Sequence, residues 1–130
     1  MAVEHLALRV IHGINVAAAG FFGLSALFAP KFAATQLFSG SIAPSHSLSV
    51  TGALWTSISL GSACGLYNPL PFASILLIQL LYKGLFVVFH TLPWLAGGRK
   101  TSFPAIMSAV FMFWIVVNPF IIPWGYLFAI

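Results

Sequence analysis

The stretch from Pro71 to Trp94 constrains this chain most, because it is a long apolar run with a lysine near its middle. It reads PFASILLIQLLYKGLFVVFHTLPW and has the length and apolar character of a helix that spans a lipid bilayer. A charged side chain at that depth is costly, so Lys83 marks a functional or architectural centre by default.

Helical periodicity predicts that this run has one polar face and one apolar face. At about 3.6 residues per turn, one side gathers the residues Gln79, Lys83, Phe86 and His90, with Tyr82 at its edge. The opposite side is aliphatic and holds Ile75, Leu77, Ile78, Leu81, Leu85 and Val88. We therefore expect the polar side to face other helices and the aliphatic side to face lipid.

The composition argues against a water-soluble globular domain and for a membrane protein. Of the 130 residues, 61% are hydrophobic and 5% are charged, whereas soluble domains carry about 25% charged residues. The mean hydropathy is +1.07. The five basic residues do not predict nucleic-acid binding, because Arg9 and Lys83 fall inside apolar segments and leave too few for a basic stripe. The single cysteine, Cys64, cannot form an internal disulfide.

Four apolar segments predict an all-α, antiparallel four-helix bundle in the membrane, with both termini on the same side and one domain over residues 1–130. The expected spans cover residues 6–29, 47–67, 72–92 and 105–124. The turn Asn68-Pro69-Leu70-Pro71 makes the second and third spans a hairpin, because neither proline favours a continued helix. After the third span, we expect the chain to turn through Pro93 and the glycines that follow it.

The two longer loops carry basic residues, which bears on orientation. Loops 30–46 and 93–104 contain Lys31, Arg99 and Lys100, so the positive-inside tendency places them on the cytoplasmic, stromal or matrix side. The segment KFAATQLF within the first loop either lies flat at the membrane interface as an amphipathic segment or packs as an ordinary loop.

The remaining spans carry features that predict how they pack. In the first span, helical spacing predicts an inner face of polar and small residues, made of His5, Arg9, His12, Val16, Ala19, Gly23 and Ala26. On this face Ala19 and Gly23 form a pair of small residues and permit close approach of another helix. The second span is rich in Ser, Thr and Gly, and its hydroxyls can bond to the carbonyl about four residues earlier. In the fourth span, Pro119 and Pro123 predict that the last third kinks or unwinds. Pro119 removes a backbone donor, so we expect a bend between Ile115 and Pro119.

Lys83 leads the candidate binding residues. We hypothesise that it anchors a polar cluster facing a cavity for a ligand head group, with the candidate residues Tyr82, Gln79, Arg9, His12 and Asn118. The alternative is a structural lysine, satisfied by backbone carbonyls and neighbouring side chains or snorkelling to the interface. The only acid of the chain, Glu4, lies at the far end of another helix and is not an obvious partner.

Two histidines are candidate ligands for a haem or a chlorophyll-type pigment. A neutral imidazole suits either metal, and both His12 and His90 lie in predicted spans. The first and third spans run parallel, which puts the two histidines at opposite ends, so a haem held by both is not expected. A pigment held by a single histidine remains open, and no other metal site is expected.

A resemblance to a known group rests on three short motifs. They are an arginine in the first helix, a Gly/Ser-rich second helix ending in GLYNP, and a third helix reading LIQLLYKGLF. Together they resemble the DoxX-like family of small four-helix membrane proteins over about Arg9 to Trp94. The resemblance implies the four-helix fold, and some members of the wider group are linked to thiosulfate and quinone chemistry. It transfers no active-site residue to this chain.

The chain offers few groups for catalysis, with one cysteine and one acid and no phosphate-binding glycine loop. We therefore expect a non-catalytic accessory or structural subunit of a larger membrane assembly, one that holds a lipid, quinone or pigment. The alternative is a DoxX-like redox participant that binds a quinone oxygen through Lys83, Tyr82 and Gln79. The expected partners are the lipid bilayer and other membrane proteins, not nucleic acid.

Overall fold

A computed structural model describes the chain over residues 5–41, 43–97 and 105–129, and all regular secondary structure in these ranges is helical. The prediction of an all-α protein is therefore confirmed. The four longest elements are α1 (Leu6–Phe28), α3 (His46–Tyr67), α4 (Ser74–Phe86) and α6 (Ala105–Ile121). Shorter elements join or extend them: α2 (Pro30–Phe32), η1 (Ala33–Leu37), η2 (Val87–Thr91), α5 (Leu92–Ala96) and α7 (Trp124–Phe128), where η marks a π-helical turn.

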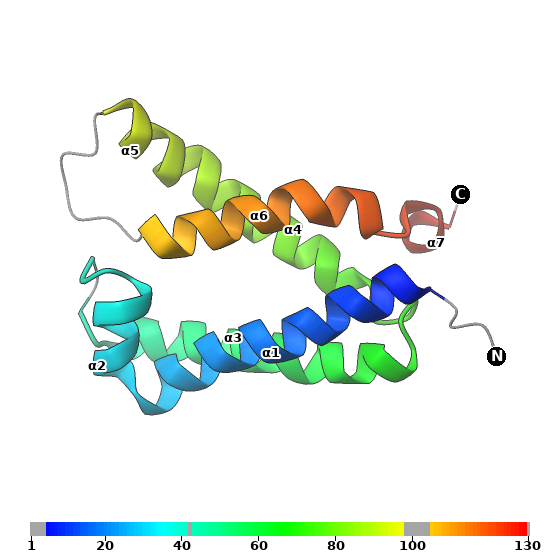
Figure 1. Ribbon diagram of the computed structural model, residues 1–130, viewed down its shortest axis with the longest axis horizontal. Coiled ribbons are helices and arrows are strands. Elements are labelled where there is room, and N and C mark those ends of the chain that lie inside the picture. The colour runs from blue at the N-terminus through cyan, green and yellow to red at the C-terminus, as the bar shows by residue number, and fades with distance from the viewer. Residues whose placement is uncertain (1–4, 42, 98–104, 130) are drawn as a thin grey trace.

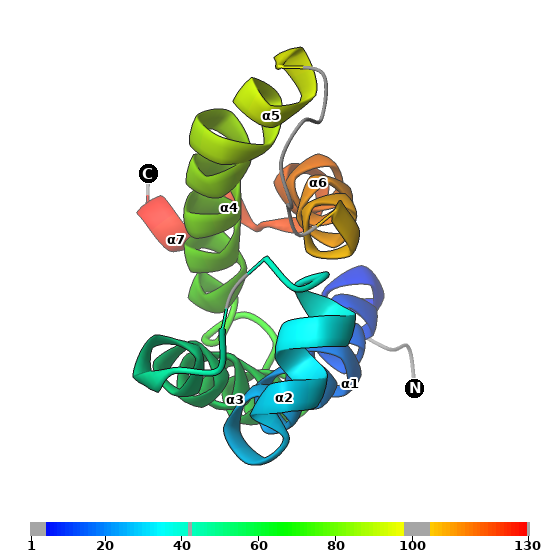
Figure 2. The ribbon, with the colours of Figure 1, turned by 90° about the vertical axis from the view of Figure 1, so that its left-hand side faces the viewer.

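The helices form two antiparallel pairs, as Figure 1 shows. Helix α1 packs along α3, and α4 packs against α6. Seen from the end of the molecule, the α1–α3 pair and the α4–α6 pair lie in two layers (Figure 2). The start of α1 and the end of α7 lie at the same end of the molecule (Figure 1), as predicted for the two termini.

Close contact between α1 and α3 depends on glycines. A Cβ atom on Gly23 would lie 2.6 Å from the backbone nitrogen of Thr56, and one on Gly52 would lie 2.8 Å from the backbone nitrogen of Leu27. Such distances are too short for any larger residue unless the backbones move apart. The expected close approach at Gly23 is confirmed, and Gly52 is its counterpart on α3.

The hydroxyl groups of α3 mostly bond within their own helix, as predicted. The side chains of Thr51, Thr56 and Ser57 donate to the carbonyl four residues earlier at 3.0, 2.8 and 2.8 Å. Ser59 differs, since its hydroxyl donates across the helix interface to the carbonyl of Val16 at 2.9 Å. One hydroxyl therefore adds a polar link to the α1–α3 contact.

The third helical run is longer than the predicted 72–92, extending from Ser74 to Ala96 through α4, η2 and α5. The chain does not turn at Pro93, because this residue lies in the first turn of α5. Proline has no N–H to offer the carbonyl of Phe89, four residues earlier. The π-helical turn η2 directly precedes it and changes the helical register where that donor is missing.

The fourth span is interrupted in its last third, as predicted, and the interruption lies at Pro123, not at Pro119. Helix α6 includes Pro119 and ends at Ile121, so its assignment is not broken between Ile115 and Pro119. The interruption lies at Pro123, which cannot donate to the carbonyl of Pro119. The indole Nε1 of Trp124 donates to that carbonyl instead, at 2.9 Å, and α7 then begins. The helix predicted over 105–124 therefore ends at Ile121, and a separate short helix begins at Trp124.

The segment after α1 is helical and packed rather than an irregular loop. One face of α2 and η1 buries Ala33, Ala34 and Leu37, while Lys31 and Gln36 are exposed on the other. The ring of Phe38, directly after η1, stacks on Trp55 with 5.9 Å between centroids. The segment is amphipathic, and its apolar face covers one end of the bundle.

Two apolar clusters fill the interior. One contains Leu8, Ile11, Ala73, Leu76, Trp114 and Ile122. The other is larger and includes Ala19, Leu48, Trp55, Val87, Met107 and Phe111. The ring of Phe111 lies between other aromatic rings, with centroid distances of 6.3 Å to Trp55, 5.9 Å to Tyr82 and 5.4 Å to Phe86. This aromatic group joins α3, α4 and α6.

Candidate functional site

Polar side chains from every long helix are buried inside the molecule. They are His12, Asn15, Ser59, Ser62, Gln79, Lys83, Thr91, Ser108 and Asn118. Two helical runs, Leu6–Phe28 and Ser74–Ala96, are long and apolar enough to cross a membrane, by length and composition. The candidate site is the part of this polar interior that surrounds Lys83.

Lys83 is buried, with 4% of its surface exposed, and its amine is surrounded by aromatic rings. The Nζ atom lies 4.6 Å from the ring centroid of Trp114, 5.6 Å from that of Phe111 and 5.7 Å from that of Tyr82. Ring faces attract a cation through their quadrupole. Among the described residues, no oxygen accepts a hydrogen bond from this amine. We call Tyr82, Phe111 and Trp114 the aromatic box.

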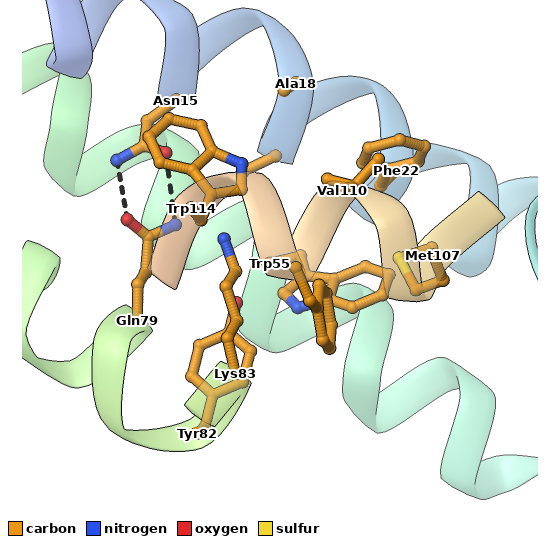
Figure 3. Close-up of a pocket in the computed structure, with 12 residues that line it drawn as sticks. Asn15, Ala18, Phe22, Trp55, Gln79, Tyr82, Lys83, Met107, Val110 and Trp114 are labelled. Carbon is orange, nitrogen blue, oxygen red and sulfur yellow. Dashed lines mark hydrogen bonds between the residues drawn. The ribbon is translucent and has the colours of Figure 1, made fainter. Parts of the chain in front are cut away.

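Gln79 pairs with Asn15, which is not among the predicted binding residues. Its amide and that of Asn15 exchange two hydrogen bonds, at 2.8 and 3.1 Å. Figure 3 shows this pair beside Lys83, whose side chain extends from α4 toward Trp114. The inner face predicted for the first helix took Val16 instead of Asn15. The sequence signal that identifies Asn15 is a side-chain amide within an apolar helix, because such a group needs a hydrogen-bond partner within the bundle.

A small cavity of about 20 Å³ lies among these side chains. Its polar lining residues are Asn15, Gln79, Tyr82 and Lys83. The rest of the lining is Ala18, Ala19, Phe22, Trp55, Met107, Val110, Phe111 and Trp114. A cavity above roughly 10–15 Å³ admits one water molecule, so this space takes a single oxygen-sized group.

A larger, open apolar groove of about 340 Å³ adjoins that cavity. It lies between α3, α4 and α6, and its lining residues are Phe38, Thr51, Leu54, Trp55, Tyr82, Phe86, Met107 and Phe111. Four of these, Trp55, Tyr82, Met107 and Phe111, also line the Lys83 cavity. The two spaces therefore share a wall that includes two rings of the aromatic box.

The two candidate histidines are not brought together. His12 is completely buried against Gly65, where an added Cβ atom would lie 2.6 Å from the imidazole. Its Nε2 donates to the carbonyl of Pro69 at 3.4 Å, which assigns the tautomer, and its buried Nδ1 has no partner among the described residues. His90 is exposed on η2. Neither nitrogen of His12 has an open path to a pigment in this conformation.

Arg9 and Asn118 lie away from the Lys83 cavity. Arg9 donates through Nη1 to the carbonyl of Leu66, near the C-terminal end of α3, and lines a separate pocket of about 270 Å³. Asn118 donates through Nδ2 to the carbonyl of Leu76 at 3.3 Å, so it joins α6 to α4. Of the six predicted binding residues, the structure brings Lys83, Tyr82 and Gln79 to one cavity and places Arg9, His12 and Asn118 elsewhere.

The chemistry available at this site is that of an amine donor beside an apolar groove. No group of three or more metal-ligating side chains was found in the described ranges 5–41, 43–97 and 105–129. The Lys83 amine can donate to an acceptor oxygen, and the groove can hold a hydrophobic body. No protein-family model, curated protein sequence or solved structure matches this chain.

Proposed function

We propose that this protein is a small integral membrane protein with four spans, a non-catalytic accessory subunit that holds a hydrophobic ligand beside Lys83. The observation that carries the proposal is the inverted distribution of polarity: polar side chains are buried between the helices, and large apolar side chains cover their outer surfaces. Water-soluble proteins show the opposite preference for polar groups, and large exposed apolar surfaces mark contact with membranes or partners.

The apolar outer surface includes all four long helices. Its members on α1 include Val10, Phe21 and Leu24; on α3 Val50, Leu54 and Leu60; on α4 Ile78, Leu81 and Leu85; and on α6 Ile106, Phe113 and Val116. Many of these side chains have half or more of their surface exposed. Lipid chains would cover such surfaces without the cost of hydrating them.

The length of α3 also suits a bilayer. Helix α3 has 22 residues, or about 33 Å at 1.5 Å per residue, which matches a hydrocarbon core of roughly 30 Å. Its many hydroxyls lower its apolar character, but those of Thr51, Thr56 and Ser57 are satisfied within the helix. In this topology the loop holding Lys31 lies on the cytoplasmic, stromal or matrix side. Arg99 and Lys100, which contribute to that orientation, lie outside the described residues.

The four-span topology can be tested by cysteine labelling in intact membranes. In a Cys64→Ala background, Ser57→Cys places a thiol at the middle of α3, on its exposed face. We expect a water-soluble maleimide to leave it unmodified until the membrane is dissolved in denaturant. Ser39→Cys, in the exposed segment after η1, is the matched control and should be labelled from one side of the membrane. Equal labelling of both sites in intact membranes would overturn the proposal.

The ligand can be tested by gentle purification. We would record an absorption spectrum and identify co-purified small molecules and protein chains by mass spectrometry. Lys83→Met keeps the side-chain length and removes the charge, so bound ligand should fall while the helical content persists. Lys31→Met, which changes an exposed lysine, should leave the ligand unchanged. The same ligand content in both variants would show that Lys83 is only a tolerated internal charge.

A second candidate function is a quinone-binding redox participant, which the resemblance to DoxX-like proteins implies. The shared placement of Tyr82 and Lys83 around one cavity supports it. Because Gln79 is already paired with Asn15, Lys83 and Tyr82 would bind the quinone oxygen without it. A quinone in the co-purified material, with redox changes in its absorption spectrum, would favour this candidate over the accessory subunit.

A further inference from the structure

We infer that the Lys83 cavity and the adjoining groove bind a single-chain amphiphile with a carboxylate head group, as in a fatty acid. Its hydrocarbon chain would occupy the groove, and its carboxylate would accept a hydrogen bond from Lys83. This inference rests on the proposed function and names the class of ligand. Three features support it: the amine of Lys83, the apolar groove, and the wall that the cavity and the groove share.

In its protonated form, Lys83 would select for an anion. The residues lining its cavity include one cation and no carboxylate. An ammonium group has three N–H donors, and the aromatic box attracts the charge without supplying an oxygen acceptor. A carboxylate would supply both the opposite charge and the acceptor, giving a short charge-assisted hydrogen bond in a medium where such bonds are strong.

The groove selects for a hydrocarbon chain. Its lining consists of aromatic and aliphatic side chains, with hydroxyls only from Thr51 and Tyr82. Its volume of about 340 Å³ is roughly twice that of an engineered 150 Å³ apolar cavity that binds benzene. A hydrocarbon chain of about this volume fits in the groove, whereas a polar or charged group there would lose its hydration without compensation.

The shared wall sets the distance between chain and head group. Tyr82 and Phe111 line both spaces, and the Lys83 Nζ atom lies 5.7 and 5.6 Å from their ring centroids. The inner edge of the groove and the Lys83 cavity therefore lie on either side of these two rings, and the carboxylate would pass between the rings so that one oxygen enters the cavity. The 20 Å³ cavity admits one oxygen, which suits one arm of a carboxylate and not a bulky phosphate ester.

The test uses the full chain in lipid nanodiscs and two probes that differ only in head group, ω-bromododecanoic acid and ω-bromododecanol. Bromine quenches tryptophan fluorescence at short range, and Trp55 lines the groove. The quenching attributed to Trp55 is the part of the fluorescence decrease that is absent in the Trp55→Phe variant. Concentrations are corrected for partition of each probe into protein-free nanodiscs.

We expect the acid to quench Trp55 at a concentration roughly tenfold or more below that of the alcohol, as hydrogen bonds to charged groups imply. Lys83→Met should abolish this preference, and Lys31→Met should preserve it. Leu54→Phe narrows the groove and should weaken both probes. Leu60→Phe, the same change at an exposed position of α3 outside the groove, should weaken neither.

The outcomes separate this inference from the proposed function. Equal potency of the two probes in the native protein would overturn recognition of a carboxylate and leave an uncharged ligand. This comparison does not depend on the folding of any variant. A preference that persists in Lys83→Met would overturn the role of Lys83. Absence of Trp55 quenching by both probes would overturn the groove as the chain site. The membrane topology is tested independently by the labelling of Ser57→Cys.

Discussion

The side-chain amides of Asn15 and Gln79 exchange two hydrogen bonds, at 2.8 and 3.1 Å, that join α1 to α4. Both side chains are about 1% exposed, so neither amide can turn to bulk water if the other is lost. The pair connects the two helix layers beside Lys83, where the cavity lies. Its loss would therefore affect both the stability of the bundle and the shape of the site.

Asn15→Leu should lower the free energy of unfolding by about 1–2 kcal/mol, because Gln79 would keep a buried amide without its partner. Replacing both amides by leucine should recover much of that loss, since no unpaired polar group remains. The measurement is SDS titration in mixed micelles, followed by tryptophan fluorescence. A double variant that loses the sum of the two single effects would show that the amides are not coupled. Ser57→Leu, on an exposed face, is the control.

Gly52→Ala should destabilise the protein by about 1–3 kcal/mol, because the new methyl group would meet the backbone of Leu27 and force α1 and α3 apart. Gly84→Ala provides the matched control, since no heavy atom lies within 4 Å of its added Cβ. That change should be neutral or stabilise by up to about 1 kcal/mol through helix propensity. The same unfolding assay compares the two, and a tolerated Gly52→Ala would contradict the close helix contact.

Trp114 and Lys83 should be energetically coupled through the short distance between the amine and the indole ring. Trp114→Leu is expected to cost more in the native protein than in a Lys83→Met background, by about 0.5–2 kcal/mol. A double-mutant cycle on the free energy of unfolding measures this difference. Equal costs in both backgrounds would mean that the ring packs beside the lysine without stabilising its charge.

Trp124→Phe should cost about 0.5–1.5 kcal/mol, because the carbonyl of Pro119 loses the indole donor that replaces the missing N–H of Pro123. The expected structural effect is a less ordered α7, measured by faster amide hydrogen exchange over residues 124–128. Tyr126→Phe removes a hydroxyl from the same short helix and serves as the control. Identical exchange in the two variants would assign no role to the indole hydrogen bond.

Local sequence signals predicted the helices, the hairpin turn and the inward position of Lys83. Apolar runs, the prolines around residues 69–71 and the spacing of polar residues act within a few turns of one helix, so they can be recognised without knowing its neighbours. The same signals were less accurate at the ends of helices. Pro93 and Pro119 proved compatible with helix, while Pro123 interrupted it. Pro93 lies in the first turn of α5, where a proline is tolerated, whereas the packing around a proline inside a span decides whether the helix continues or ends there.

The partners of the buried polar groups depended on how the helices face one another. Successive residues of a helix point about 100° apart, so periodicity defines an inner face only to within about one residue, and Val16 was chosen where Asn15 is buried. Trp114 and Phe111 reach Lys83 because α6 packs against α4, a contact between segments distant in the sequence. Arg9 lies elsewhere because the end of α3 offers it a carbonyl. These choices follow from the packing of side chains across helix interfaces, which no single segment encodes.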